Sequence, residues 1–165
     1  MQPAARRQAP DSAETGLWGE RVAADWLAKA GYSIVGRRVR PALHDEIDIV
    51  ATKGRILAFV EVKARTSEAF GRPASSVGRE NRKALCRAAA AYLRRAAYPD
   101  MAYRFDIVEV IGRANSATPP TVRHIPDAFR FPPRYRFARS SLPACQNNKA
   151  RGFLARLLAF FSRFR

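Results

Sequence analysis

Two neighbouring segments that alternate apolar and charged residues constrain the fold of this chain more than any other feature. Residues 45–52 and 55–63 both have the pattern of a β-strand, and Lys53-Gly54 between them is typical of a tight turn. The two segments are therefore predicted to pair as an antiparallel hairpin. If the turn is centred on Lys53-Gly54, Asp48 lies opposite Phe59.

The predicted hairpin has one charged face and one apolar face. The same register places Glu46 opposite Glu61, and Asp48 and Lys63 project to the same side as these two residues. The apolar residues of the other face are Ile47, Ile49, Val60 and Val62. Carboxylates that face each other destabilise a sheet unless a cation lies among them. We therefore expect a divalent metal ion, Mg²⁺ or Mn²⁺, with Asp48 and Glu61 among its ligands.

A predicted helix over residues 11–30 supplies a further carboxylate. Asp11-Ser-Ala-Glu14 is a capping-box pattern, and Gly31 is typical of a helix end. Glu20 lies in the apolar sector of this helix. The other residues of that sector are Leu17, Ala23, Ala24 and Leu27. Because an unpaired carboxylate is costly to bury, we expect Glu20 to face the sheet and to complete the metal shell. A glutamate stabilised by the helix dipole or by an arginine is the alternative.

Lys63 completes a candidate catalytic set. It follows Glu61 by two residues, so both side chains project to the same side of one strand. The ammonium group would then contact an attacking water or a scissile phosphate, while the metal lowers the pKa of that water. The four residues of the set are Glu20, Asp48, Glu61 and Lys63.

The remaining elements follow an α/β order. We expect a strand at residues 32–40, a helix at 79–97, and further strands at 104–111 and 122–125, with a connection rich in Gly, Ser and Pro at 67–78. Three consecutive strands favour a meander, and a helical crossover places a parallel neighbour beside it. The predicted fold class is therefore α/β, with a mixed central sheet flanked by helices.

The length and charge of the chain indicate its domain organisation and its partner. A chain of 165 residues supports one core. We expect a disordered leader over residues 1–10, a domain over residues 11–126 and a basic extension over residues 127–165. The formal net charge of +16 makes a polyanion the default partner, because neutralised phosphates release counterions. Nucleic acid is expected first, and DNA before RNA. Arginine enrichment caused by a GC-rich genome is the alternative.

The C-terminal extension has a pattern of its own. Apolar residues recur at helical spacing in the last dozen residues, with arginines between them, which predicts an amphipathic helix. Such a helix could dock onto the domain, bind nucleic acid or lie on an anionic membrane surface. The first residues lack the apolar stretch of a secretory signal, and Cys86 and Cys145 lie too far apart for a CxxC pair. A cytoplasmic location is therefore expected.

Other polar residues are assigned by position. Arg65, on the strand face of Lys63, and Lys83 and Arg87, four residues apart on the second helix, are candidate nucleic-acid contacts, with a solvated basic face as the alternative. Asp106 is expected to pair with a nearby arginine in a structural role. Neither His44 nor His124 has metal-ligand spacing, so both are expected in loops. Gly-rich phosphate loops and Ser/His nucleophile patterns are missing from the sequence.

Several motifs together resemble a known family. They are Gly19-Glu20, Asp45-Glu-Ile-Asp-Ile-Val50, Phe59-Val-Glu-Val-Lys-Ala-Arg65, Arg104-Phe-Asp-Ile-Val108 and His124-Ile-Pro-Asp-Ala-Phe129. In order and spacing, over about residues 16–126, the chain resembles the YraN-like uncharacterised protein family (UPF0102 type). That family in turn resembles the PD-(D/E)xK nucleases and archaeal Holliday-junction resolvases.

The resemblance implies a fold, a site and an activity. It implies a restriction-endonuclease-like core with Glu20, Asp48, Glu61 and Lys63 as its active-site residues, and a homodimer by analogy with resolvases. The expected activity is metal-dependent hydrolysis of phosphodiester bonds in DNA, including branched or flapped DNA. A nucleic-acid-binding accessory protein that keeps the fold without cutting is the alternative. Asp45 departs from the family pattern, which usually has Gly there, and would add an anion near the site.

Overall fold

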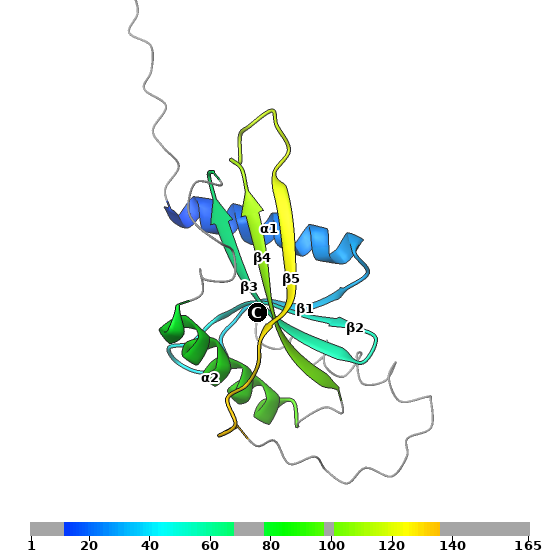
Figure 1. Cartoon of the computed structure of the whole chain (residues 1–165), viewed down its shortest axis with the longest axis vertical. Helices are drawn as coiled ribbons and strands as arrows, with labels where there is room; N and C mark the ends of the chain where they lie inside the picture. The colour runs from blue at the N-terminus through cyan, green and yellow to red at the C-terminus, as the bar shows by residue number, and fades with distance from the viewer. Residues whose placement is uncertain (1–11, 68–77, 98–100, 136–165) are drawn as a thin grey trace, which may run out of the picture.

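A five-stranded mixed sheet with two helices forms the centre of the chain (Figure 1). The computed structural model describes residues 12–67, 78–97 and 101–135. The elements in chain order are α1 (Ser12–Lys29), β1 (Ser33–Val39), β2 (Ile47–Lys53), β3 (Ile56–Arg65), α2 (Arg79–Arg95), β4 (Ala102–Ile111) and β5 (Thr121–Phe129). The predicted α/β class is confirmed, and each predicted element in this part of the chain is present.

The strand order in the sheet equals the order in the chain, β1-β2-β3-β4-β5. The first three strands form an antiparallel meander, β3 and β4 are parallel, and β5 pairs antiparallel with β4. A short turn can join only antiparallel neighbours, so the single parallel pair occurs where the chain passes through α2. The predicted mixed sheet is confirmed.

The two helices cover opposite faces of the sheet. On β3, Phe59 belongs to the buried cluster of α2, whereas Ala58 and Val60 belong to the cluster of α1. Alternate residues of a strand point to opposite faces, so the two clusters lie on either side of the sheet. In Figure 1, α1 crosses the upper part of the sheet and α2 lies at its lower end. The first half of β3, residues 57–60, is therefore buried on both faces.

The register of the β2–β3 hairpin differs from the predicted one. Lys53 pairs with Ile56, and Phe59 pairs with Val50 rather than with Asp48. The turn consists of residues 54 and 55, because Gly54 adopts the positive φ of 58° that a two-residue hairpin turn requires. Pairing between the two strands ends at Ile49 and Val60, so Glu46 has no partner on β3. The predicted pairs were wrong by two residues, which leaves side-chain alternation unchanged.

The predicted apolar face of the hairpin is only partly correct. Ile49, Val60 and Val62 face α1, but Ile47 packs in the cluster of α2. Regular alternation would place Ile47 and Ile49 on the same face, so β2 departs from a regular strand at Asp48 between them. On the helix, Ala23, Ala24 and Leu27 are buried as expected, whereas Leu17 is 42% exposed and lies outside the core.

The last strand continues past the predicted domain end at residue 126. β5 reaches Phe129, whose ring stacks on Phe105 at 4.6 Å between centroids. Phe131 and Tyr135 also pack against the α2 cluster. Residues after Pro126, as far as Tyr135, therefore also pack against this core. The predicted leader, the connection at 68–77 and the C-terminal helix lie outside the described residues.

Neither helix in the described part of the chain is long and apolar enough to cross a bilayer. The expected cytoplasmic location stays a prediction.

Candidate active site

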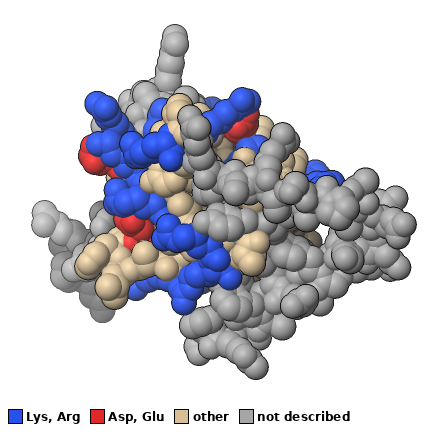
Figure 2. Space-filling view, turned by 90° about the horizontal axis from the view of Figure 1, so that it is seen from below, with Lys and Arg blue, Asp and Glu red and all other residues tan. Residues whose placement is uncertain are grey.

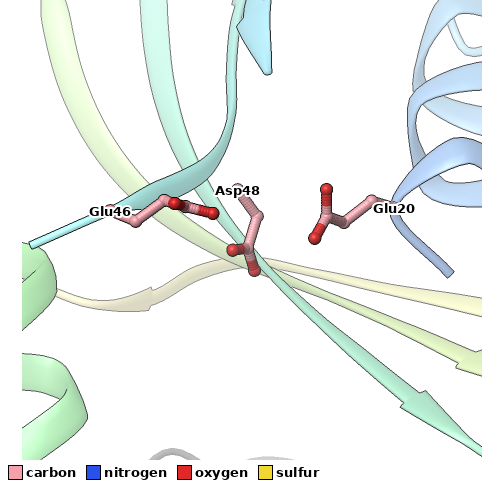
Figure 3. A group of neighbouring side chains, drawn as sticks. All are labelled: Glu20, Glu46 and Asp48. Carbon is pink, nitrogen blue, oxygen red and sulfur yellow. The ribbon is translucent and has the colours of Figure 1, made fainter. Parts of the chain in front are cut away.

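Three carboxylates meet where β2 begins. Glu20 comes from α1, Asp48 from β2, and Glu46 from the residue just before β2 (Figure 3). One oxygen of each lies within 4.8 Å of an oxygen of the other two, a grouping that could hold a metal ion. Figure 3 shows the Glu20 side chain pointing from the helix toward Asp48. A helix, a loop end and a strand thus bring one acidic cluster together.

Glu20 points into the protein, as predicted. The residue is 9% exposed, and its Oε2 is buried with no hydrogen-bond partner among the residues described. The helix approaches the sheet closely at the preceding residue, because a Cβ added to Gly19 would lie 2.6 Å from the Cβ of Ala64. Burial raises the pKa of Glu20, while the charge of Arg38 acts in the opposite direction. A buried oxygen without a partner is costly unless a ligand satisfies it.

The Asp48 side chain accepts a hydrogen bond from a backbone N–H of β3 that has no carbonyl of β2 opposite it. Its Oδ2 accepts a hydrogen bond from the Val62 N–H at 2.7 Å, just beyond the last β2–β3 pair, Ile49 and Val60. A buried N–H needs an acceptor, and here a side chain supplies one that the diverging strand does not. This bond fixes the Asp48 carboxylate beside β3.

The environment of Asp48 disfavours its negative charge. Burial raises its pKa to about 7, and the nearby charges of Glu61 and Glu20 act in the same direction. The Val62 hydrogen bond and the charge of Lys63 oppose this rise in the pKa. A cation placed among these groups would therefore be bound favourably, because it would relieve the repulsion that raises the pKa.

Glu61 and Lys63 lie next to each other on β3. Lys63 Nζ donates to Glu61 Oε1 at 2.5 Å, and both side chains are half-buried, with exposed fractions of 25% and 15%. Both residues act electrostatically on Asp48, so they lie close to the cluster. Glu61 does not belong to the group of carboxylates within 4.8 Å, whereas Glu46 does. The predicted ligand set was Asp48, Glu61 and Glu20, whereas the group in the structure contains Glu46 in place of Glu61.

Glu46 is bound by two arginines that sequence reasoning did not single out. Arg38 Nε donates to its Oε1 at 3.0 Å, and Arg40 Nε donates to its Oε2. The spacing of two residues in Arg38-Val-Arg40, close ahead of the acidic segment, was the available signal. It is weak, because arginines are frequent throughout this chain. The contacts were found only from the structure.

Two of the predicted nucleic-acid contacts are engaged in ion pairs. Lys83 Nζ donates to Glu80 Oε1 at 2.7 Å on the same helix. Arg87 forms a two-pronged pair with Asp45, at 2.9 Å from Nε to Oδ2 and 2.8 Å from Nη2 to Oδ1. Asp45 was expected to add an anion near the site, but this pair offsets its charge and fastens the β1–β2 loop to α2. Arg65 is half-buried at the end of β3.

Asp106 forms the centre of a second polar group, away from the cluster. It is fully buried and accepts bonds from Arg104 Nε at 2.7 Å, from Arg104 Nη2 at 2.8 Å and from the Asp127 N–H at 3.1 Å. His124 Nε2 lies 2.8 Å from its Oδ2. Burial alone would raise the Asp106 pKa, yet the bonds from His124 and Arg104 lower it. The predicted arginine pair is confirmed, but His124 lies in β5 and not in a loop.

Positive charge dominates one face of the molecule. Figure 2, seen from below, shows Lys and Arg side chains over much of the described surface of this face and acidic side chains only in small separate places. A surface of this kind favours approach of a polyanion.

His44 lies in the β1–β2 loop, as predicted.

The fold and the acidic cluster define an α/β protein with a mixed sheet whose second strand carries a carboxylate site. The family model described as "Uncharacterised protein family UPF0102" matches residues 19–110, which include every residue of the cluster. This chain belongs to that family.

Several relatives are similar to this chain in sequence over most of their own length. The chain is 41% identical over 100 residues to a UPF0102 protein of Alkaliphilus metalliredigens, which covers 61% of this chain and 87% of that protein. It is 42% identical over 118 residues to one of Chlorobaculum tepidum, covering 69% of this chain and 90% of that protein. A third, from Desulfosudis oleivorans, is 44% identical over 101 residues, covering 61% of this chain and 81% of that protein.

Proposed function

We propose that this protein is a metal-dependent nuclease that hydrolyses phosphodiester bonds in DNA, including branched or flapped DNA. The observation that carries the proposal is the meeting of Glu20, Glu46 and Asp48 within 4.8 Å, beside the Glu61–Lys63 pair of the neighbouring strand. The net charge of +16 supports a polyanionic substrate.

The donor set fits a hard divalent cation. Carboxylate oxygens are the protein ligands that Mg²⁺ and Mn²⁺ favour, and Glu20 contributes a buried oxygen that lacks a partner among the described residues. Asp48 and Glu20 would hold the ion, with Glu61 or Glu46 as the further ligand. When bound, such an ion would lower the pKa of a coordinated water and offset charge on the phosphate.

The residues of the chain have separate roles in this proposal. Asp48 is held in place by the Val62 N–H, so its carboxylate is oriented before any ligand arrives. Lys63 uses one of its three ammonium donors on Glu61, and the others can anchor a water or a phosphate oxygen. The two charges of this pair lie on one strand at fixed spacing. Glu20 is carried by a helix that packs tightly on the sheet at Gly19.

The resemblance of the motifs to PD-(D/E)xK nucleases supports the same assignment. Those enzymes place an Asp and a Glu-x-Lys on neighbouring strands, which matches Asp48, Glu61 and Lys63 here. Membership of the UPF0102 family supports the first step of this resemblance, since the motifs that resemble those nucleases are the ones that resemble this family.

A cleavage assay tests the proposal. The full chain is incubated with Mn²⁺ and with plasmid, flapped duplex or four-way-junction DNA, alongside Asp48→Asn, Glu20→Gln and Lys63→Ala. Glu80→Gln is the matched control, because this glutamate is 78% exposed on α2 and pairs with Lys83 on the same helix. We expect metal-dependent products from the wild type and the control, and at least a 100-fold loss in each site variant.

The outcomes separate the two function classes. Products that persist at wild-type rate in Asp48→Asn and Lys63→Ala would show that the cutting belongs to another site or a contaminant. DNA binding without cleavage of any substrate would favour the accessory protein instead. A thermal melt with increasing Mn²⁺ shows independently whether the cluster binds the ion, and Asp48→Asn should abolish the shift.

A further inference from the structure

Arg38 in β1 and Arg40 just after it lie beside the acidic cluster without a role in the proposed reaction. Both donate through Nε to Glu46, one to each carboxylate oxygen. Their side chains are 46% and 67% exposed, while that of Glu46 is 23% exposed. Glu46 therefore lies between two guanidinium groups at the boundary with solvent.

This bonding leaves the outer edge of each guanidinium group available. Arginine pairs most strongly with a carboxylate when two nitrogens bind both oxygens, as Arg87 does with Asp45. Arg38 and Arg40 instead use a single nitrogen each. Within residues 12–67, 78–97 and 101–135, neither group has a hydrogen-bond partner other than Glu46. Their Nη atoms keep the planar donor geometry that matches phosphate.

The backbone at Arg38 supports a ligand role. Its φ of 49° lies in a region that residues with a side chain adopt rarely. The strand continues on both sides, because Arg37 pairs with Ile49 and Val39 pairs with Ile47. The surrounding ladder therefore maintains a conformation that aims the side chain at Glu46. Strained residues of this kind cluster at ligand sites.

The negative charges of the cluster explain why two arginines beside it would favour binding of a phosphate. Glu20, Glu46 and Asp48 repel any polyanion that approaches them, so a phosphate backbone needs cations at the edge of the cluster. Among the described residues, Arg38 and Arg40 form ion pairs with the cluster, both through Glu46.

We infer that Arg38 and Arg40 grip a phosphodiester group of nucleic acid through their Nη atoms, with Glu46 holding the two guanidinium groups in position. The inference rests on the proposed function for the class of substrate. It concerns binding alone, so it can be tested without cleavage.

Binding of a fluorescein-labelled four-way DNA junction to the full chain tests the inference. Anisotropy is recorded over a series of KCl concentrations with EDTA present, so that no metal-dependent cleavage occurs. Arg38→Gln and Arg40→Gln are compared with Arg130→Gln, an exposed arginine that also bonds one carboxylate and follows β5 at the opposite edge of the sheet. Thermal melting confirms that each variant is folded.

We expect each glutamine variant to lower the slope of log K against log salt by about 1, and the double variant by about 2. The slope of Arg130→Gln should stay that of the wild type. Arg38→Lys should keep the slope but bind more weakly, because lysine keeps the charge and lacks the planar N–H donors of the guanidinium group.

Three results would overturn the inference. The first is that the double glutamine variant binds the junction as the wild type does. The second is that Arg130→Gln lowers the slope as much as Arg38→Gln or Arg40→Gln does. The third is that phosphatidylserine vesicles displace the DNA at equal phosphate concentration. If no DNA is cleaved in the cleavage assay but the slopes change as expected, the proposed nuclease function is rejected and the inference that Arg38 and Arg40 bind phosphate stands.

Discussion

Replacing Asp48 by Asn should stabilise the folded protein, and the gain should grow with pH. Asn keeps an oxygen that can accept the Val62 N–H and removes the charge that its surroundings disfavour. In the folded protein, burial, with the charge of Glu61 next in effect, raises the pKa of Asp48 from 3.8 to about 7. A group whose pKa is raised on folding binds its proton more tightly in the native state, so its favourable contribution is lost as pH rises toward 7.

The magnitude follows from the two pKa values. A carboxyl whose pKa rises from 3.8 to about 7 destabilises the fold by up to about 4 kcal/mol once both states are ionised. Asp48 is partly exposed, and solvent screens part of this effect, so we expect about 2 kcal/mol at about pH 8. At about pH 4 the native carboxyl is protonated, and the difference should fall below about 1 kcal/mol.

Urea denaturation at about pH 4 and about pH 8, with EDTA present, measures the difference. An increase of about 2 kcal/mol corresponds to a rise in Tm of roughly 4 to 8 °C. Asp127→Asn is the control, because Asp127 is 42% exposed and pairs with Arg130 at the surface. It should change the free energy of unfolding by less than about 1 kcal/mol at either pH. A gain from Asp48→Asn that is equal at both pH values, or a loss at pH 8, would refute the reasoning.

Three further predictions concern the fold. Gly19→Ala should destabilise the protein by about 1 to 3 kcal/mol in urea denaturation because the added Cβ would stand 2.6 Å from a β3 side chain, whereas Gly16→Ala, three residues earlier with open space, should be neutral or stabilising by up to about 1 kcal/mol. Asp106→Ala should cost about 3 to 5 kcal/mol because it removes the fully buried carboxylate that pairs with Arg104, whose own side chain is 18% exposed. The lowered pKa of Asp106 also means that its contribution is present above about pH 4 and is lost as pH falls further, which an acid titration followed by circular dichroism would show. Phe129→Ala should cost about 2 to 3 kcal/mol, since its ring stacks on Phe105; no loss would place it outside the core.

The elements of the fold were predictable because their patterns are local. Alternation of apolar residues marks β2 and β3, and helical spacing of Ala23, Ala24 and Leu27 marks the buried side of α1. The inward position of Glu20 followed from the same spacing. Only one crossover is long enough for a helix, so the parallel pair of strands also followed from chain order.

The register of the hairpin was not predictable from the same patterns. Lys53-Gly54 and Gly54-Arg55 are both acceptable turns by composition, and moving from one to the other leaves every side chain on its face. The two registers differ in whether Lys53 belongs to the turn or to the strand. In the structure it pairs with Ile56, and its Nζ bonds to the Ala30 carbonyl at 2.8 Å, a contact between residues far apart in the chain.

The sequence by itself determined which segments become strands and helices and which carboxylates point inward, because these properties depend on neighbours within a few residues. Only the tertiary structure decided that Glu46 joins the cluster, that Arg38 and Arg40 bind it, and that His124 meets Asp106. Polar side chains are satisfied by whichever groups the packed strands and helices bring within about 3 Å, and those groups come from distant parts of the chain.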